Sequence, residues 1–382
     1  MLIKNATIYT ETEVIKGSLA IKNGKIEQIF DGIPDDLTLY QDIIDGSNLN
    51  VIPGFIDTHI HGANGADVMD ATTEAISTIA NYLVSEGTTS FLATTITQST
   101  ENIERALTNL AQYENEASGA EMIGIHLEGP FIEKSKAGAQ PLEYIKKPDL
   151  DLFNHWQEIS GHKIKTITLA PEHDQGWHFT SALRKAGVNV SAGHTNANFS
   201  ELDKAVKHGV NQMTHLCDAM SGIHHRDIGA VGLAFLSDEL KAEIIADGIH
   251  VDPTMLQLIY RNIGPKRLII ITDAMRAKGL EPGDYELGGQ PVRVTEDRAV
   301  LDNGSLAGSI LNMIDGAKQF FTLPNVSIQD IIQMTSVNPA KQAGVFKDKG
   351  SIAVGKDADL LLVDHDLNLK MTLKKGKIVY EE

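Results

Sequence analysis

The sequence has a single cysteine, Cys217, so no disulfide can form within the chain. A fold without disulfides is typical of a reducing compartment, and we expect this protein in the cytoplasm. The N-terminal segment "MLIKNATIYTETEVIKGSLAIKNGKI" lacks the apolar stretch of a signal peptide, and no apolar run is long enough to span a bilayer. We therefore expect no association with a membrane.

Basic residues are scarce. The chain has 33 Lys and Arg against 51 Asp and Glu, which gives a formal net charge of −18. Such an acidic protein is expected to repel nucleic acids and anionic membrane surfaces, so neither is expected as a partner. An anionic substrate would need a local group of cations to overcome this overall field.

The two ends of the chain share a β-rich texture. "LIKNATIYT" and "VIKGSLAIKNGKIEQIF" near the start alternate like short strands, with Asn23-Gly24 as a turn signal. "GSIAVGKDADLLLVDHDLNLKMTLKKGKIVY" at the other end has the same pattern. We expect residues 1–52 and 350–382 to pair into one small β-domain, leaving residues 53–349 as a separate catalytic domain.

The middle of the chain alternates short apolar runs with helical patterns such as "TEAISTIANYLVSEG" and "FSELDKAVKHG". Eight strands alternating with helices predict an α/β fold, a (β/α)8 TIM-like barrel. The eight runs are Phe55–His61, Thr89–Thr95, Met122–Leu127, Thr166–Ala170, Val188–Ala192, Gln212–Leu216, Glu243–Ala246 and Arg267–Thr272.

Ionisable side chains lie at the end of most of these runs. In a barrel of this type the carboxyl ends of the strands form the active-site face, so we expect these side chains to meet there. His59 and His61 are two residues apart in a strand and therefore point to the same side. The residues are His59, His61, Glu128, His194, His215, Asp247, His250 and Asp273.

Imidazoles and carboxylates together are suitable ligands for Zn, Fe, Mn, Co or Ni. The set is large enough for two divalent metals, or for one tight site and one weak site, and the sequence leaves both open. Each histidine taken alone could be an ordinary buried residue. His126, inside the third run, is interpreted as a core or supporting residue.

A second polar cluster, "SGIHHRDIGAVG", follows the sixth run. Arg226 has a planar guanidinium that suits phosphate or carboxylate, and His224 and His225 add cationic character. A solvated loop is an equally good interpretation. The segment "GSLAGS", residues 304–309, either brings backbone against a ligand or forms only a turn.

Several of these segments resemble a known family. "PGFIDTHIHG" together with "GKDADLLLVD" is similar to the amidohydrolase superfamily. Within it, "HLEGPF", "SAGHT", "THLCDAMSGIHHRDIGAVG", "ADGIHVDP", "ITDAM" and "LAGS" resemble the N-acetylglucosamine-6-phosphate deacetylase family, in the family's order and over essentially the whole chain.

The resemblance implies a (β/α)8 barrel with a small β-sandwich domain formed from both termini, and a homodimer. It places a tight metal on Glu128, His194 and His215. A second metal would use His59 and His61, with Glu128 bridging and Asp273 nearby. Asp273 corresponds to the family's catalytic aspartate.

The resemblance also implies a phosphorylated amino sugar as the substrate. Arg226, with His225 beside it, and His250 correspond to contacts with the phosphate or the sugar. Asp218 departs from the asparagine expected before "AM". Its side chain would repel the phosphate if it faced it, whereas a contact through the backbone N–H alone would change little. Gln140 stands where some relatives have a histidine. It is expected to help stabilise the oxyanion that forms when the amide carbonyl is attacked. Further contacts, several through the backbone, are expected at Ala139, Asp218, Ala219, Leu306, Ala307 and Gly308.

The expected reaction is hydrolysis of the acetamide of N-acetyl-D-glucosamine 6-phosphate to D-glucosamine 6-phosphate and acetate. A metal-bound hydroxide would attack the carbonyl, and Asp273 would act as general base and then general acid. The galactosamine epimer is an alternative substrate. Hydrolysis of a cyclic amide is less favoured, because Glu128 fills the bridging position that a carboxylated lysine often fills there. A non-catalytic scaffold is not favoured, because such a protein would have lost its ligands.

Overall fold

The computed structural model describes all residues from Met1 to Glu382. Its central sheet has eight parallel strands, and it confirms the predicted barrel, with each predicted run shifted only at its ends. In chain order the strands are β6 (Phe55–Ile60), β9 (Thr88–Thr95), β10 (Glu121–Glu128), β11 (Ile164–Leu169), β12 (Asn189–Ala192), β13 (Val210–Met213), β14 (Lys241–Ile245) and β15 (Leu268–Ile271).

The first and last barrel strands close the sheet on itself. The backbone N–H of Asp273 donates to the carbonyl of His59 at 2.8 Å, and that of His61 donates to Ala274 at 2.9 Å. The buried carboxylate of Asp57 accepts a hydrogen bond from the Thr272 hydroxyl at 2.5 Å, which ties the same two strands together below the mouth. The carboxyl ends of β6 and β15 are therefore neighbours.

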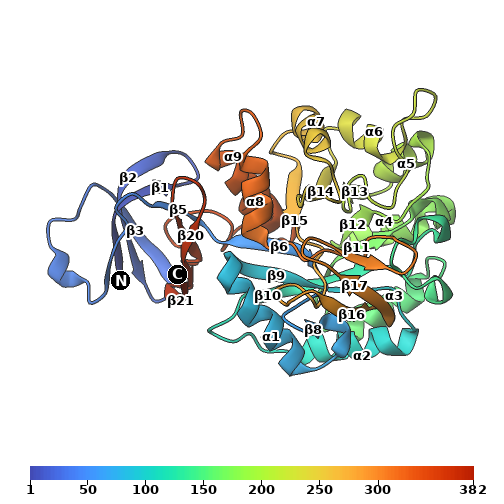
Figure 1. Ribbon diagram of the computed structural model, residues 1–382, viewed down its shortest axis with the longest axis horizontal. Helices are drawn as coiled ribbons and strands as arrows, with labels where there is room; N and C mark the ends of the chain where they lie inside the picture. The colour runs from blue at the N-terminus through green and yellow to red at the C-terminus, as the bar shows by residue number, and fades with distance from the viewer.

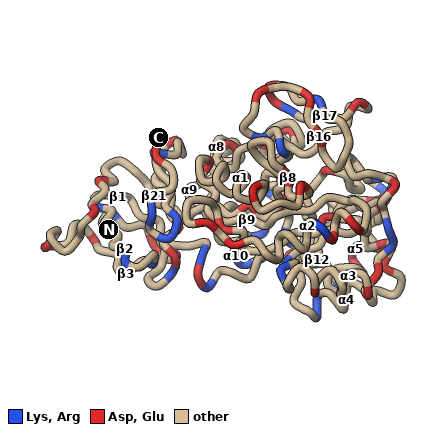
Figure 2. Tube along the Cα trace, turned by 90° about the horizontal axis from the view of Figure 1, so that it is seen from below, with Lys and Arg blue, Asp and Glu red and all other residues tan.

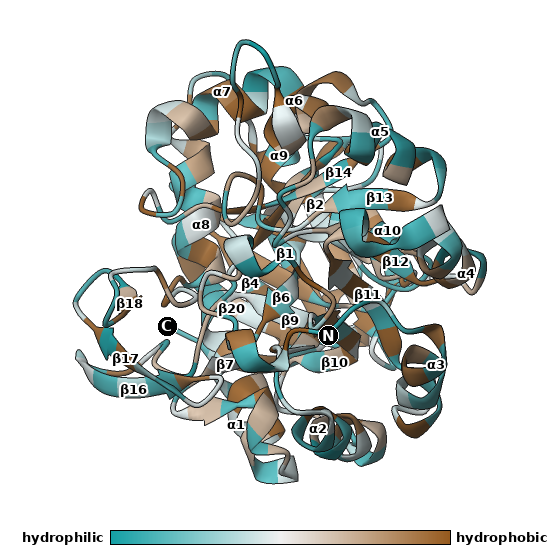
Figure 3. Ribbon diagram, turned by 90° about the vertical axis from the view of Figure 1, so that its right-hand side faces the viewer, coloured by the Kyte–Doolittle hydropathy of each residue, from teal (hydrophilic) through white to brown (hydrophobic).

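Helices surround the barrel strands (Figure 3). The side chains of Thr72, Ser99 and Asn198 cap the first turns of α1, α2 and α5. No helix is both long enough and apolar enough to cross a membrane. The helices are α1 (Thr73–Leu83), α2 (Thr100–Gln112), α3 (Leu150–Ile159), α4 (His178–Lys185), α5 (Phe199–Lys207), α6 (Gly229–Leu236), α7 (Pro253–Ile263), α8 (Met313–Phe321), α9 (Ile328–Ile332) and α10 (Asn338–Gln342).

Strands from both termini pair in one further eight-stranded sheet, and Figure 1 shows the two chain ends together beside the barrel. The sheet curls around its own apolar core, which includes Ile8, Leu19, Val51 and Leu360. Its strands are β1 (Leu2–Tyr9), β2 (Val14–Lys22), β3 (Lys25–Asp31), β4 (Ile43–Asp45), β5 (Asn50–Pro53), β19 (Leu360–Val363), β20 (Leu369–Lys374) and β21 (Lys377–Glu381).

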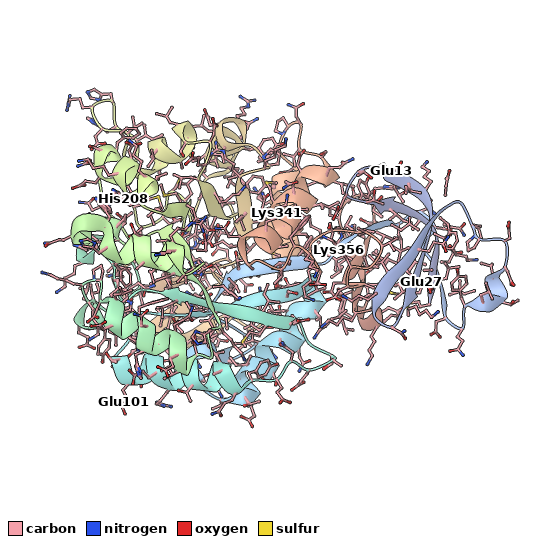
Figure 4. All side chains as sticks on the ribbon, turned by 180° about the vertical axis from the view of Figure 1, so that it is seen from behind. Glu13, Glu27, Glu101, His208, Lys341 and Lys356 are labelled. Atoms are coloured by element: carbon pink, nitrogen blue, oxygen red, sulfur yellow. The ribbon has the colours of Figure 1, made fainter.

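Cation contacts mark the junction between the terminal sheet and the barrel. Lys341 and Lys356 lie in this region (Figure 4), with their ammonium groups 4.7 and 3.7 Å from the centre of the Phe346 ring. Lys349 is buried and forms ion pairs with Asp359 at 2.7 Å and with Glu121, in β10, at 3.0 Å. These contacts attach the terminal sheet to the barrel.

A small antiparallel sheet after β15 was not predicted. It consists of β16 (Gly283–Leu287), β17 (Gln290–Val294) and β18 (Ala299–Leu301), with Gly288-Gly289 at the first turn. A further short hairpin pairs β7 (Gly62–Ala63) with β8 (Ala66–Asp67) after β6. Alternating apolar and polar residues on both sides of a Gly-Gly turn are a hairpin signal, and this signal would have located the three-stranded sheet. Figure 2 shows the three-stranded sheet projecting from the barrel, with acidic and basic residues interleaved.

A buried ion pair links three segments at the amino-terminal side of β9. The Lys278 ammonium lies 2.7 Å from Glu86 Oε2, and the two side chains are 0% and 2% exposed. Glu86 also accepts a hydrogen bond from the Met313 backbone N–H at the start of α8.

We predict that Lys278→Met lowers the free energy of unfolding by about 3–5 kcal/mol, because it leaves the buried Glu86 carboxylate without its cation. Urea denaturation measures the change. As a control, Lys207→Met removes the exposed pair with Asp203 and should cost less than about 0.5 kcal/mol. Equal losses in the two variants would contradict a structural role for the buried pair.

Candidate metal centre and active site

Four histidine side chains converge on the carboxylate of Glu128 at the mouth of the barrel. Glu128 Oε1 lies 3.2 Å from His215 Nε2, 3.3 Å from His194 Nε2 and 3.4 Å from His59 Nε2. Glu128 Oε2 lies 3.2 Å from His61 Nε2. Four predicted ligands from the ends of three strands thus meet around the carboxylate that β10 supplies.

Asp273 completes this cluster from the end of β15. Its Oδ1 atom lies 3.2 Å from His61 Nε2 and 3.4 Å from His59 Nε2, and its side chain is 13% exposed, toward the pocket. His194, His215 and Asp273 have φ angles of 47°, 31° and 48°. This left-handed conformation is costly for residues with a Cβ and is typical of functional sites, because it turns side chains inward at strand ends.

The second ring nitrogen of two of these histidines is hydrogen-bonded to a backbone carbonyl. His194 Nδ1 lies 2.8 Å from the Lys136 oxygen, and His61 Nδ1 lies 3.2 Å from the Thr94 oxygen. A carbonyl can only accept, so each ring donates a proton from Nδ1, which leaves Nε2 as the nitrogen that faces the cluster and can bind a metal. This is the tautomer that a metal ligand requires.

The cluster suits a divalent metal. His59 Nε2 is fully buried without a hydrogen-bond partner, and His194 Nε2 and His215 Nε2 face each other at 3.1 Å. Two groups of three possible ligands, His59–His61–Glu128 and Glu128–His194–His215, share Glu128. Nitrogen lone pairs that converge beside a carboxylate match the ligand preferences of zinc and similar metals.

The electrostatics of the cluster favour a cation. Burial opposes a charge on His61, yet its hydrogen bonds to Asp273 and Glu128 raise its pKa to about 10. Burial likewise opposes ionisation of Asp273, but His59 and His61 hold its pKa at about 2. A site that stabilises a protonated imidazole in this way also stabilises a metal cation.

A pocket of about 320 Å³ opens onto the cluster. Of the predicted substrate contacts, those that line it are Ala139, Gln140, Asp218, Ala219, His250, Leu306 and Gly308. Ala307 is buried behind the lining. His225 and Arg226 are exposed on the loop before α6, outside the lining, where Arg226 Nη1 lies 2.7 Å from His225 Nε2.

Other pocket residues were missed in the sequence. Lys136 is the only lysine or arginine in the lining, and Leu287 and Ser305 reach it from the segment after β15. The segment "EKSKAGAQP" directly follows the Glu128 motif, so its position could have pointed to Lys136. Nothing local indicates that Leu287 faces the pocket, because that depends on how the small sheet folds back.

Gln140 contacts the candidate metal ligand Glu128 directly. Its Nε2 donates to Glu128 Oε2 at 2.7 Å, and its Oε1 accepts from the Thr97 backbone N–H at 2.8 Å. The Thr97 N–H fixes which end of the amide faces Glu128. One of the two amide hydrogens is therefore used to orient the carboxylate.

His250 is held at the pocket wall by Asp247. His250 Nδ1 lies 2.6 Å from Asp247 Oδ2, and the other Asp247 oxygen accepts from the backbone N–H groups of Ile249 and His250. Asp218 lies in the same wall, where burial raises its pKa to about 6. When ionised, Asp218 adds a negative charge to the pocket.

The family is shown by a match over most of the chain. Residues 50–379 match the model of the amidohydrolase family. The chain therefore belongs to the amidohydrolase family, a class whose barrel and converging histidines agree with the site described above.

Within this family, individual relatives match over the full length. The chain is 46% identical to N-acetylglucosamine-6-phosphate deacetylase from Bacillus subtilis, covering 100% of this chain and 97% of the relative. It is 32% identical to N-acetylgalactosamine-6-phosphate deacetylase from Escherichia coli, covering 85% and 86%. It is also similar to the structure of an aspartate-to-alanine variant of N-acetyl-D-glucosamine-6-phosphate deacetylase from Mycobacterium smegmatis in complex with N-acetyl-D-glucosamine-6-phosphate, with a TM-score of 0.92, 29% identity and 99% of each chain covered.

We predict that His194→Ala loses the metal held with Glu128 and His215, because one of three ligands is removed. Metal content of the purified protein, measured by mass spectrometry, checks this. His208→Ala is the control, since His208 lies at the outer edge of the barrel (Figure 4) and should leave the metal content unchanged. Full metal retention in His194→Ala would contradict the ligand set.

Proposed function

We propose that this protein hydrolyses the acetamide of N-acetyl-D-glucosamine 6-phosphate, releasing acetate and D-glucosamine 6-phosphate. The observation that carries the proposal is the position of the Asp273 carboxylate, which faces the pocket beside the Glu128–histidine cluster. The full-length similarity to the Bacillus subtilis deacetylase supports the choice of substrate.

We propose that Glu128, His194 and His215 hold one divalent metal, and that His59, His61 and Glu128 hold a second, with Asp273 nearby. Zn, Fe, Mn, Co and Ni all suit these ligands. A metal held by these residues would lower the pKa of a bound water and polarise the acetyl carbonyl.

Asp273 is the proposed general base and acid. Its carboxylate faces the pocket beside the proposed ligands, where it can accept the proton of the attacking water. The same carboxyl group then gives that proton to the departing amine nitrogen of the sugar. No covalent intermediate with the protein is needed.

Gln140 and the pocket backbone position the acetyl group and the sugar. The amide hydrogen of Gln140 that Glu128 does not use is proposed to stabilise the oxyanion. His250, oriented by Asp247, is proposed to contact the sugar or its phosphate. Backbone contacts are proposed at Ala139, Asp218, Ala219, Leu306, Ala307 and Gly308.

The phosphate needs more positive charge than one chain brings to the pocket, where Lys136 is the only fixed cation. We propose that the protein is a homodimer and that Arg226 and His225 reach the phosphate of a substrate bound in the second subunit. Ile223, an apolar side chain on the same loop that is 51% exposed, supports a subunit interface there.

The galactosamine epimer is the second candidate substrate, favoured by the similarity to the Escherichia coli enzyme. The two sugars differ only in the configuration at one hydroxyl group.

We propose the cytoplasm as the compartment, since Cys217 is the only cysteine. We also propose residues 1–52 plus 350–382 and residues 53–349 as the two domains.

We predict chelator-sensitive acetate release from N-acetyl-D-glucosamine 6-phosphate, and slower release from both the epimer and unphosphorylated N-acetylglucosamine. Asp273→Asn should reduce turnover about 100-fold or more while the protein keeps its metal, because the proton acceptor is lost. A coupled acetate assay with metal analysis of the same samples measures both. Release from none of the three substrates by metal-loaded protein would overturn the substrate, and an active Asp273→Asn variant would overturn the base.

We predict that Arg226→Ala raises KM for the phosphorylated substrate and leaves KM for unphosphorylated N-acetylglucosamine unchanged, because only the phosphate contact is lost. Co-expression of Arg226→Ala with Asp273→Asn should produce mixed dimers with one intact site, which restores activity at low substrate concentration. Unchanged kinetics would remove Arg226 from the site. Lack of restoration in verified mixed dimers would show that each chain uses its own Arg226.

A further inference from the structure

A fully buried carboxylate, Glu243, lies inside the barrel below the metal cluster. It is in the middle of β14 and is 0% exposed. Its Oε2 atom lies 3.2 Å from His59 Nδ1, and its Oε1 atom accepts from Gln212 Nε2 at 2.6 Å. No lysine or arginine pairs with it, so His59 is its only ionisable hydrogen-bond partner.

A chain of three amides leads to Glu243 through the barrel interior. Asn189 Nδ2, at the start of β12, donates to Gln212 Oε1 at 3.1 Å. Gln342 Nε2, at the end of α10, donates in turn to Asn189 Oδ1. Every amide in the chain therefore directs its N–H toward the next residue, and the last one directs it to Glu243.

An ionised carboxylate can only accept hydrogen bonds, at both oxygens. Gln212 must therefore present its amide N–H to Glu243, and His59 must carry its proton on Nδ1. The Nε2 atom of His59 is then the nitrogen left for a metal. It points to Glu128 Oε1 and Asp273 Oδ1, each at 3.4 Å, and it has no hydrogen-bond partner.

Glu243 is not itself placed to bind a metal. Both its oxygens are used below the His59 ring. The neighbouring His126, whose ring centre is 4.5 Å from that of His59, also has both nitrogens occupied, by Thr168 Oγ1 at 2.7 Å and the Thr58 carbonyl at 3.2 Å. Of the three possible ligands His59, His126 and Glu243, only His59 retains a free nitrogen.

Burying a carboxylate without a cationic lysine or arginine is costly, so a structural acceptor would be cheaper as a neutral group. A negative charge behind an imidazole, however, fixes the ring and makes its other nitrogen a stronger metal donor. We propose that Glu243 is a positioning residue that fixes the His59 tautomer and strengthens His59 Nε2 as a metal ligand, with Gln212, Asn189 and Gln342 supporting it. This inference rests on the metal site of the proposed function.

Nitrogen NMR of the zinc-loaded protein with 15N-labelled histidine tests the tautomer without any change to the fold around Glu243. A His59→Asn variant identifies the His59 signals. We expect proton coupling at Nδ1 of His59 and a metal-shifted Nε2. A His59 ring protonated at Nε2 in the zinc-loaded protein would overturn the proposal.

Glu243→Gln tests the charge with little change in shape. We expect the affinity of the His59–His61–Glu128 group for zinc to fall about 10–100-fold, measured by chelator competition on folded protein. Asp174→Asn is the matched control, because Asp174 is also buried but only accepts from the backbone of Phe179 and Thr180 at α4.

A purely structural Glu243 would lower the melting temperature of Glu243→Gln and leave zinc affinity unchanged, which would overturn the proposal. Both readouts are independent of substrate. Failure of the wild-type protein to release acetate would therefore overturn the proposed reaction and leave the inference on Glu243 standing.

Discussion

The backbone hydrogen bonds that join β6 to β15 are the constraint on which the rest of the site depends. The bond from Asp273 N–H to the His59 carbonyl joins the ends of the first and last barrel strands. In an open sheet these two strands would lie at opposite edges. Closure places the proposed base, Asp273, within 3.4 Å of both histidines of the first strand.

Closure also concentrates charge at the barrel mouth. Glu128 and Asp273 lie among four histidines in a region with little access to water, and three of the site residues adopt positive φ angles. Such features are costly by themselves and persist only where the surrounding structure holds them in place. Here the apolar cluster of 67 buried residues around the strands supplies that support.

The placement of charged side chains explains how an acidic protein can bind an anionic substrate. The net charge of −18 acts over the whole surface, whereas Lys136 and the ligand cluster act at the pocket. Arg226 and His225 are exposed on a loop outside that pocket. The cations proposed to contact the phosphate thus lie on loops, while the candidate metal ligands lie at strand ends, where geometry is more rigid.

The sequence by itself determined the barrel and located the candidate ligands at strand ends, because both depend on local spacing. Periodic apolar runs located the eight strands, and residues such as His194 and His215 were recognisable from their place at strand ends. Only the tertiary structure decided that Gln140 contacts Glu128, that Arg226 lies outside the pocket, and that Glu243 lies behind His59. These depend on loop paths and on hydrogen bonds between residues far apart in the chain, and no local pattern encodes the direction in which a buried amide or imidazole donates its proton.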